Sequence, residues 1–226
     1  MIRRLVQATN FLLGKAISKS HIHFVNSLNW LQRTRSVDQN YLDYIRLSTL
    51  ELISAEIKEG GIQGAVAELG VYKGKFARYI NQYFPDRKFY LFDTFAGFDS
   101  KDVKTELDKT FSGGAQDFSD TSVEAVLKRM PYPDQCVVKK GFFPETAEGL
   151  NEQFALVSLD ADLYEPIYAG LKYFYPRLNR GGYIMIHDYN NDHYKGAREA
   201  VRKFCREQGI SFTPIPDSGG TAIISK

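Results

Sequence analysis

Residues 64–93 constrain the fold of this chain more than any other stretch, because they place two apolar segments on either side of a short helical one. The apolar run in 64–69 is typical of a buried strand, and the two glycines in 70–74 predict a turn. Residues 75–83 have the pattern of a helix, and 88–93 form a second apolar strand that ends in an acid. This order predicts half of a nucleotide-binding βαβ unit.

The turn of this unit has residues suited to hold a ligand against the backbone. Gly70 and Gly74 carry no Cβ, so the chain can turn sharply while the next helix directs its free N–H groups to the same place. Asp93 ends the second strand, where a carboxylate can accept hydrogen bonds from both hydroxyls of a ribose. Alternatively, Asp93 and Glu68 serve only as helix-capping acids.

The glycine spacing differs from that of dinucleotide-binding proteins. Three residues separate Gly70 from Gly74, and no third glycine follows at the required offset. Glu68, which we place inside the turn, would also repel a pyrophosphate. A cationic or amino-bearing ligand such as S-adenosylmethionine suits this acid better.

Composition narrows the class of protein. A chain of 226 residues has room for one domain with a sheet of about six or seven strands, and 43% hydrophobic with 25% charged residues is typical of a soluble globular protein. The formal charge of +2 argues against a nucleic-acid partner. Cys136 and Cys205 lie in unlike contexts that predict neither a disulfide nor a thiolate metal site, so we expect a cytoplasmic protein.

The N-terminal segment is basic. Residues 1–37 contain no Asp or Glu, and their apolar residues fall near one face of a helix without an uninterrupted core for secretion or a membrane span. This arm could pack on the domain, across a homodimer or, less favoured, on an anionic membrane. A second helix is expected over 38–58 with Asp38 as its N-cap. We therefore divide the chain into an N-terminal helical arm and cover, 1–60, and a main domain, 61–226.

The rest of the chain alternates strands and helices. Residues 94–117 interrupt this alternation as a long polar loop, either a lid at the carboxyl edge of the sheet or an incidental insertion. The apolar run 154–159 predicts a central strand covered on both faces. The other expected elements are a helix from Ser119 or Asp120 to Arg129, a strand over 135–139, a helix over 164–178 closed by 180–182, a strand over 183–186, a helix over 196–208, and two last strands, 211–213 and 221–225, forming an antiparallel hairpin.

Polar residues follow the apolar strands at one edge of this sheet. Asp160 and Asp162 end the strand 154–159 and fall on one side of an extended segment, while His187 and Asp188 end the next strand. In a doubly wound sheet, ligands bind beyond the carboxyl ends of the strands where the winding reverses. If the reversal lies between 64–69 and 154–159, these residues converge with Glu68 on one crevice.

Such crowded carboxylates repel one another unless a cation lies between them or one of them keeps a proton. Mg²⁺ prefers oxygen ligands, and a substrate hydroxyl bound to it becomes more acidic, so that a nearby carboxylate could remove its proton. The alternatives are that Asp160 only caps a helix and that His187 has a structural role without metal contact.

Four motifs occur in the order found in a known family. They are Val66-Ala67-Glu68-Leu69-Gly70-Val71-Tyr72-Lys73-Gly74, Leu91-Phe92-Asp93-Thr94-Phe95-Ala96-Gly97-Phe98, Ser158-Leu159-Asp160-Ala161-Asp162-Leu163-Tyr164 and Ile186-His187-Asp188-Tyr189. From about residue 41 to the C-terminus, the chain resembles the macrocin O-methyltransferase family of the TylF, MycF and NovP type. The resemblance implies a class I enzyme that depends on S-adenosylmethionine and Mg²⁺ and methylates sugar hydroxyls of antibiotics. Together with the predicted elements, it indicates an α/β, Rossmann-like, doubly wound seven-stranded sheet, mostly parallel with an antiparallel C-terminal strand, plus the N-terminal helical arm.

The resemblance also implies which residues bind the cofactor. The methionine part would be held by Glu68, Gly70 and Gly74, and the ribose by Asp93. The remaining cofactor-binding candidates belong to the same two motifs, and they are Tyr72, Thr94 and Phe95.

For the reaction, the resemblance implies Asp162 as the general base and Asp160 and Asp188 as ligands of Mg²⁺ or Mn²⁺. His187 departs from the family pattern, because it stands where the antibiotic enzymes have the first Asp of an Asp-Asp pair. Imidazole is a poor Mg²⁺ ligand, which puts the metal, its geometry or its necessity in doubt. We keep His187 both as a candidate metal ligand and as a candidate catalytic residue.

Two other functions stay open on the sequence. A nicotinamide-dependent sugar oxidoreductase is disfavoured by the missing glycine, and the only Tyr-x-x-x-Lys pair, Tyr168 and Lys172, falls inside a predicted helix. A non-catalytic, cofactor-binding regulatory module would not need Asp160, Asp162 and Asp188 together. We therefore expect a metal-assisted, S-adenosylmethionine-dependent O-methyltransferase that acts on a sugar hydroxyl of a glycan or glycosylated small molecule.

Overall fold

The computed structural model describes residues 43–226, in which strands and helices alternate along the chain. The strands are β1 (Ala65–Leu69), β2 (Phe89–Asp93), β3 (Cys136–Lys140), β4 (Phe154–Leu159), β5 (Leu178–Ile186), β6 (Thr213–Ile215) and β7 (Thr221–Ser225). The α-helices are α2 (Tyr44–Glu59), α3 (Ala77–Tyr83), α4 (Ser100–Asp108), α5 (Val123–Leu127), α6 (Tyr164–Arg177) and α7 (Lys195–Gln208), and two 3₁₀ helices are η1 (Pro133–Gln135) and η2 (Glu145–Ala147). This alternation is that of an α/β fold.

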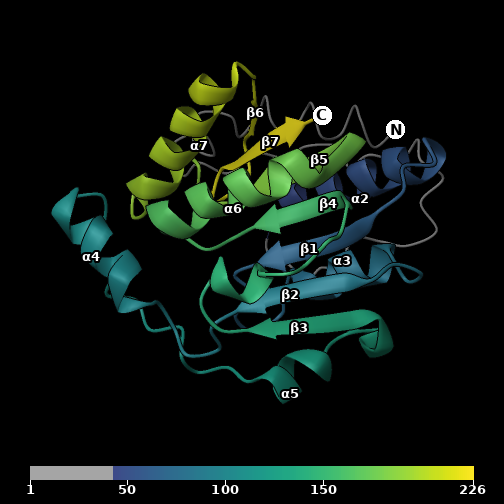
Figure 1. Ribbon diagram of the computed structural model, residues 1–226, viewed down its shortest axis with the longest axis horizontal. Coiled ribbons are helices and arrows are strands. Elements are labelled where there is room, and N and C mark those ends of the chain that lie inside the picture. The colour runs from purple at the N-terminus through teal and green to yellow at the C-terminus, as the bar shows by residue number, and fades with distance from the viewer. Residues whose placement is uncertain (1–42) are drawn as a thin grey trace, which may run out of the picture. The chain divides into compact units, whose positions relative to one another are not determined.

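The strands form one seven-stranded sheet in the order β3-β2-β1-β4-β5-β7-β6. β1 to β5 run parallel, whereas β7 runs antiparallel to both β5 and β6. The arrowheads of β1 to β4 accordingly point to the same edge (Figure 1). The winding proceeds from β1 to β2 and β3 on one side and to β4 and β5 on the other, so it reverses between β1 and β4. The predicted doubly wound, mostly parallel sheet is confirmed.

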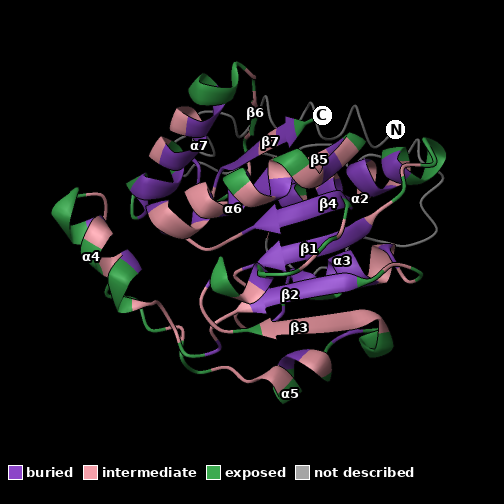
Figure 2. Cartoon of the chain, in the orientation of Figure 1, coloured by how far each residue is buried: buried purple, intermediate pink, exposed green. Residues whose placement is uncertain are grey.

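The centre of the sheet is covered on both faces. Every residue of β1 and β4 is buried, in agreement with their continuous apolar patterns (Figure 2). α6 packs with α7 on the face nearest the viewer in Figure 1, and α2 packs with α3 behind the sheet. Inside, the rings of Phe92, Phe143 and Phe154 all have their centroids within 5.7 Å of the Phe174 centroid. These large apolar rings make a close-packed core beneath the strand ends.

Helix α2 begins later than predicted. Its N-cap is Asp43 rather than Asp38, and the Asp43 carboxylate accepts a hydrogen bond of 3.0 Å from the N–H of Arg46. Buried apolar residues, including Leu47 and Leu50, attach the helix to the body of the protein. The described residues 43–226 fall in one compact unit, so α2 lies in the same unit as the sheet.

Residues 94–117 contain helix α4 instead of being a loop throughout. Asp99 caps α4 by accepting a hydrogen bond of 2.8 Å from the N–H of Lys101. The fully buried Glu106 accepts hydrogen bonds from the N–H of Tyr164 at 2.6 Å and from the hydroxyl of Ser112 at 2.7 Å. The polar composition hid this helix, because one of its acids is used to cap the start of α6. In Figure 1, α4 lies beyond the carboxyl edge of the strands.

Several other boundaries differ from the predictions. α6 ends at Arg177 and β5 begins at Leu178, so residues 180–182 belong to the strand and not to a connecting loop. α5 starts after Ser122, whose hydroxyl accepts a hydrogen bond of 3.1 Å from the N–H of Ala125, and not after Ser119 or Asp120. The predicted C-terminal hairpin is confirmed, with its first strand shifted to Thr213–Ile215.

The predictions for residues 1–37, namely the basic helical arm and its contact with a second copy or a membrane, lie outside the described residues. Within residues 43–226, no helix combines the length and the apolar character needed to cross a bilayer.

Candidate active site

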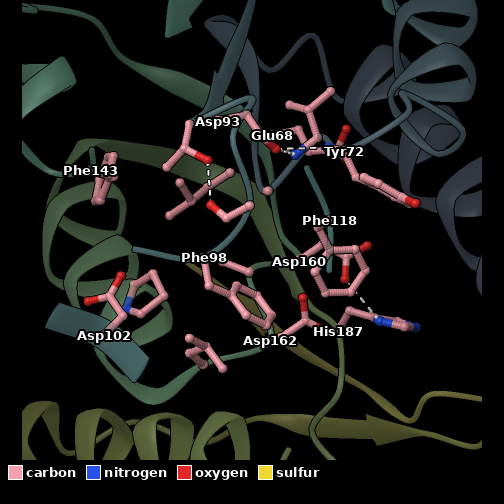
Figure 3. A pocket seen from close by; sticks show the side chains of 18 of the residues that line it. Glu68, Tyr72, Asp93, Phe98, Asp102, Phe118, Phe143, Asp160, Asp162 and His187 are labelled. Carbon is pink, nitrogen blue, oxygen red and sulfur yellow. Dashed lines mark hydrogen bonds and ion pairs between the residues drawn. The ribbon is translucent and has the colours of Figure 1, made fainter. Parts of the chain in front are cut away.

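A cavity of about 330 Å³ opens at the carboxyl edge of the strands. The strand register explains its walls, because Leu69 pairs with both Phe92 and Leu159, and Leu159 pairs with Ile186. The residues that follow these partners therefore come level at the sheet edge, and they are Gly70, Asp93, Asp160 and His187. All four line the cavity, and Figure 3 shows the last three around it.

Gly70 allows the two central strand ends to meet. Its φ is +84°, and a Cβ at this position would overlap the carbonyl oxygen of Asp160. The N–H of Asp160 in turn donates to the carbonyl oxygen of Leu69 at 2.8 Å. The glycine therefore brings the turn after β1 directly against the carboxylates that follow β4.

Asp93 fixes the conformation of this turn. One of its carboxylate oxygens accepts hydrogen bonds from the N–H groups of Val71 at 2.7 Å and Tyr72 at 2.8 Å, and the other from the N–H of Phe95 at 2.6 Å. The sequence predicted a ribose ligand here and missed this backbone role. Three of the four lone pairs of the carboxylate are used in this way, and the one that remains, on the oxygen that binds Phe95, leaves room for a ligand hydroxyl.

The remaining cofactor-binding candidates divide into two groups. Tyr72 and Thr94 line the cavity, and the Tyr72 hydroxyl donates to Asp120 at 2.6 Å, which ties the turn to the loop before α5. Gly74 and Phe95 are not on the cavity wall. Gly74 faces the side chains of α5 and of the segment after it, so its missing Cβ makes room for helix packing.

Glu68 lies within β1, not in the turn as predicted, and it is almost completely buried beside the cavity. Its Oε1 accepts a 3.3 Å hydrogen bond from the hydroxyl of Ser158, and its buried Oε2 has no donor among the residues that the structure describes. Burial, reinforced by the charge of Asp160, raises the pKa of this carboxyl well above its usual value. Glu68 is therefore ready to pair with a cationic ligand group.

The carboxylates after β4 and β5 face nitrogen donors. Asp160 Oδ2 lies 2.9 Å from Arg46 Nη2, and Asp160 Oδ1 lies 3.0 Å from His187 Nδ1. The same imidazole nitrogen is 3.0 Å from Asp188 Oδ2, and Asp188 Oδ1 accepts a 2.7 Å hydrogen bond from the amide of Asn191. Figure 3 shows the contact between Asp160 and His187. Asp160 Oδ2 and Asp188 Oδ1 thus each have a donor of their own, and the other two oxygens share the single N–H of His187 Nδ1.

These partners set the charge of the cluster. Burial alone would raise the pKa of Asp160, but the Arg46 guanidinium and His187 outweigh it and hold that pKa well below its usual value. Burial opposes protonation of His187, yet the Asp160 carboxylate outweighs burial and raises the pKa of the imidazole from 6.5 to about 10. At neutral pH His187 therefore carries a proton and cannot act as a general base.

Asp160, His187 and Asp188 can each direct one potential ligand atom to within 4.8 Å of the others, which is the arrangement a metal site needs. The donor chemistry fits Mg²⁺ poorly, however. The ligand atom of His187 is the nitrogen that donates to both carboxylates, and Mg²⁺ prefers an octahedral oxygen shell. Hydrogen bonds and ion pairs account for the positions of the three residues without a metal ion.

Asp162, the predicted general base, lines the cavity from the loop after β4. Its φ is +58°, a left-handed conformation that Asp tolerates better than most residues. Burial, with added repulsion from Asp188 and Asp160, raises the pKa of Asp162 well above its usual value. The raised pKa favours the protonated form of Asp162, and it makes the ionised form a stronger base than an exposed carboxylate.

Arg46 and Asp102 are among the cavity-wall residues that sequence reasoning missed. Arg46 comes from α2, where it looks like an ordinary helix residue, and Asp102 comes from α4, which was taken for a loop. Burial and nearby acids raise the pKa of Asp102 to about 7. Among the aromatic residues, Phe98, Phe118 and Phe142 line the cavity, and Phe118 has its ring centroid 5.0 Å from that of Phe98.

Comparisons with known proteins identify the family of this chain. Residues 27–223 match the family described as "Macrocin-O-methyltransferase (TylF)". The chain is 30% identical over 200 residues to an 8-demethyl-8-(2,3-dimethoxy-alpha-L-rhamnosyl)-tetracenomycin-C 4'-O-methyltransferase from Streptomyces olivaceus, covering 83% of this chain and 75% of that protein. It is also 30% identical over 181 residues to a mycinamicin III 3''-O-methyltransferase from Micromonospora griseorubida, covering 74% and 70%.

Among solved structures, the O-methyltransferase NovP is similar in fold, with a TM-score of 0.64 and 22% identity over 80% of this chain and 79% of NovP. The family match extends over most of the chain. The two curated relatives are both 30% identical to it, over 75% and 70% of their own length. The chain therefore belongs to the macrocin O-methyltransferase family.

Proposed function

We propose that this protein transfers a methyl group from S-adenosylmethionine to a sugar hydroxyl of a glycosylated small molecule. The observation that carries the proposal is that the glycine turn after β1 and the buried carboxylate of Asp162 line the same cavity. A cofactor-binding turn and a proton acceptor that face one space are what an O-methyltransferase needs.

Residues at the ends of β1 and β2 suit the cofactor. The unpartnered, buried oxygen of Glu68 would pair with its amino group, and Gly70, on the cavity wall beside it, would lie against its methionine part. Asp93 holds the turn in shape and keeps one acceptor site for a ribose hydroxyl. When bound, S-adenosylmethionine supplies a methyl group on a positively charged sulfur.

Residues at the ends of β4 and β5 suit the acceptor. Asp162 would accept the proton of the acceptor hydroxyl as the new oxygen–carbon bond forms, and its raised pKa supports that role. His187, protonated at neutral pH, would instead keep Asp160 and Asp188 in place.

The opposite wall supports a sugar acceptor. Phe98, Phe118 and Phe142 offer apolar ring faces, and Asp102 offers a carboxylate to sugar hydroxyls. The printed names of both curated relatives describe O-methylation of glycosylated compounds, one of them a rhamnosyl derivative.

Mg²⁺ or Mn²⁺ assistance is the part of the family resemblance that this site supports least. Asp160, Asp188 and His187 are the residues that would hold the ion, and it would supply Lewis-acid activation of the acceptor hydroxyl. One of the nitrogen donors around these carboxylates, the Arg46 guanidinium, already brings a positive charge to this place.

The proposal is tested by incubating the protein with S-adenosylmethionine and a panel of rhamnosides and nucleotide-linked deoxysugars. Mass spectrometry should detect addition of one methyl group to at least one acceptor, and Asp162→Asn should abolish that product. Binding of S-adenosylhomocysteine but not NAD⁺ in calorimetry would support the proposal. Oxidation of a sugar with NAD⁺ and no methylation would overturn it.

A further inference from the structure

We infer that the guanidinium of Arg46 takes the place of a divalent cation at the carboxylate cluster, so that methyl transfer by this protein is metal-independent. The inference rests on the proposed function, because it concerns how the carboxylates of that same site are neutralised. Arg46 is a positioning residue here, since it contacts Asp160 and not the reacting atoms.

Arg46 brings a permanent charge into the site. Arg46 is only 5% exposed. Its Nη2 lies 2.9 Å from Asp160 Oδ2, and its guanidinium carbon is 3.9 Å from the ring centroid of Phe76. A guanidinium stays charged at any working pH, and the aromatic face favours a cation at this place. The carboxylates at the strand ends therefore have a built-in counter-charge.

The turn before β7 contacts both the start of α2, which carries Arg46, and the side chain of His187. Asp43, the N-cap of α2, accepts hydrogen bonds of 2.8 Å from both the N–H and the hydroxyl of Ser218. The next residue, Gly219, lies so close to the imidazole of His187 that a Cβ there would overlap the ring. The turn before β7 thus connects the start of α2 to His187, so the two nitrogen donors of Asp160 are positioned by one continuous structure.

A divalent cation at the same place would meet two obstacles. It would have to share the oxygens of Asp160 and Asp188 with nitrogen donors that already contact each of them, and it would lie close to the guanidinium charge. The counter-charge that a cation would supply to Asp160 already comes from Arg46.

The first test uses the full wild-type chain with S-adenosylhomocysteine bound. After dialysis against a chelator, electron paramagnetic resonance should find no stoichiometric Mn²⁺ binding, and the methylation rate should stay within about twofold of that measured with Mg²⁺. One tightly bound Mn²⁺ per chain, together with a rate that is lost on chelation and restored by Mg²⁺, would overturn the inference. Failure to bind S-adenosylhomocysteine would instead overturn the proposed function.

Variants test the role of Arg46 itself. Arg46→Met should lower kcat by about tenfold or more, because a charged hydrogen bond is lost, while Arg46→Lys should keep most of the rate. The double variant Arg46→Met/His187→Asp should gain Mn²⁺ binding, a response that a merely structural role would not produce. Arg87→Met is the matched control, since Arg87 also lies over an aromatic ring, at 5.3 Å from Phe84, but does not line the cavity.

The outcomes separate cleanly. If Arg46→Met folds and works as fast as Arg87→Met in metal-free buffer, Arg46 does not supply the needed charge and the inference is wrong. If Arg46→Met does not fold, the wild-type Mn²⁺ measurement and the Arg46→Lys rate decide.

Discussion

The two halves of the cavity are built in different ways. At the ends of β1 and β2, backbone geometry dominates: Gly70 lacks a Cβ where the strands meet, and Asp93 binds N–H groups of residues at most 22 positions away in sequence. At the ends of β4 and β5, side chains dominate, and Asp160 is held by Arg46, which is 114 positions away. The first half depends on contacts between residues close in sequence, whereas the second half depends on a contact between side chains that are far apart in sequence.

The largest effect should come from Gly70→Ala, because this residue joins both halves. A positive φ and overlap with the Asp160 carbonyl should together cost about 2–5 kcal/mol in the free energy of unfolding and abolish binding of S-adenosylhomocysteine. Gly149→Ala is a matched control, since Gly149 also has a positive φ but open space around it. Thermal unfolding and calorimetry should show a clearly smaller loss for Gly149→Ala, and equal losses would contradict the account.

Asp162→Asn should affect the reaction at the ends of β4 and β5 without affecting cofactor binding at the ends of β1 and β2. The rate should fall by about 10²–10⁴-fold, because an amide cannot accept the proton of the acceptor hydroxyl, while S-adenosylhomocysteine affinity stays nearly unchanged. Asp134→Asn, in the exposed η1, serves as the control. A mild effect of Asp162→Asn would mean that another group takes the proton.

Asp93→Asn should affect mainly the cofactor half. The loss of a charged acceptor for three N–H groups and for the ribose should weaken S-adenosylhomocysteine binding by about 1.5–3 kcal/mol in calorimetry. The turnover number at saturating cofactor should change much less than in Asp162→Asn. Unchanged affinity would show that the ribose is bound elsewhere.

The smallest effect concerns the contribution of His187, at the end of β5, to the stability of the folded protein. Because the pKa of His187 is raised from 6.5 to about 10 in the folded protein, its contribution to stability is fully present below pH 6.5 and is lost as the pH rises through about 10. The difference in melting temperature between wild type and His187→Gln, measured with chelator present, should therefore shrink over that range. A difference that is constant with pH would show that His187 is neutral in the folded protein.

The sequence predicted the parts of the site that depend on local patterns. The apolar run 154–159 coincides with β4, and the carboxylates Asp160, Asp162 and Asp188 do meet Glu68 at one sheet edge, because parallel strands bring their carboxyl ends together. Arg46 could not be found in this way, since nothing in the sequence of α2 marks this basic residue as one that turns inward. Helix α4 was missed for a related reason: Glu106 looks like a surface acid and is in fact a buried cap of α6.

The most direct test of the account is a crystal structure of the complex with S-adenosylhomocysteine, refined from metal-free crystals and after soaking in Mn²⁺. We expect the amino group at Glu68, the ribose at Asp93, and the sulfur facing Asp162 across a space wide enough for an acceptor hydroxyl about 3–3.5 Å from the transferred carbon. The ion pair between Arg46 and Asp160 should be intact, with no anomalous Mn²⁺ signal beside it. A sulfur that faces away from Asp162 would contradict the proposed reaction, and a Mn²⁺ ion bound by Asp160 and Asp188 would contradict its independence of metal.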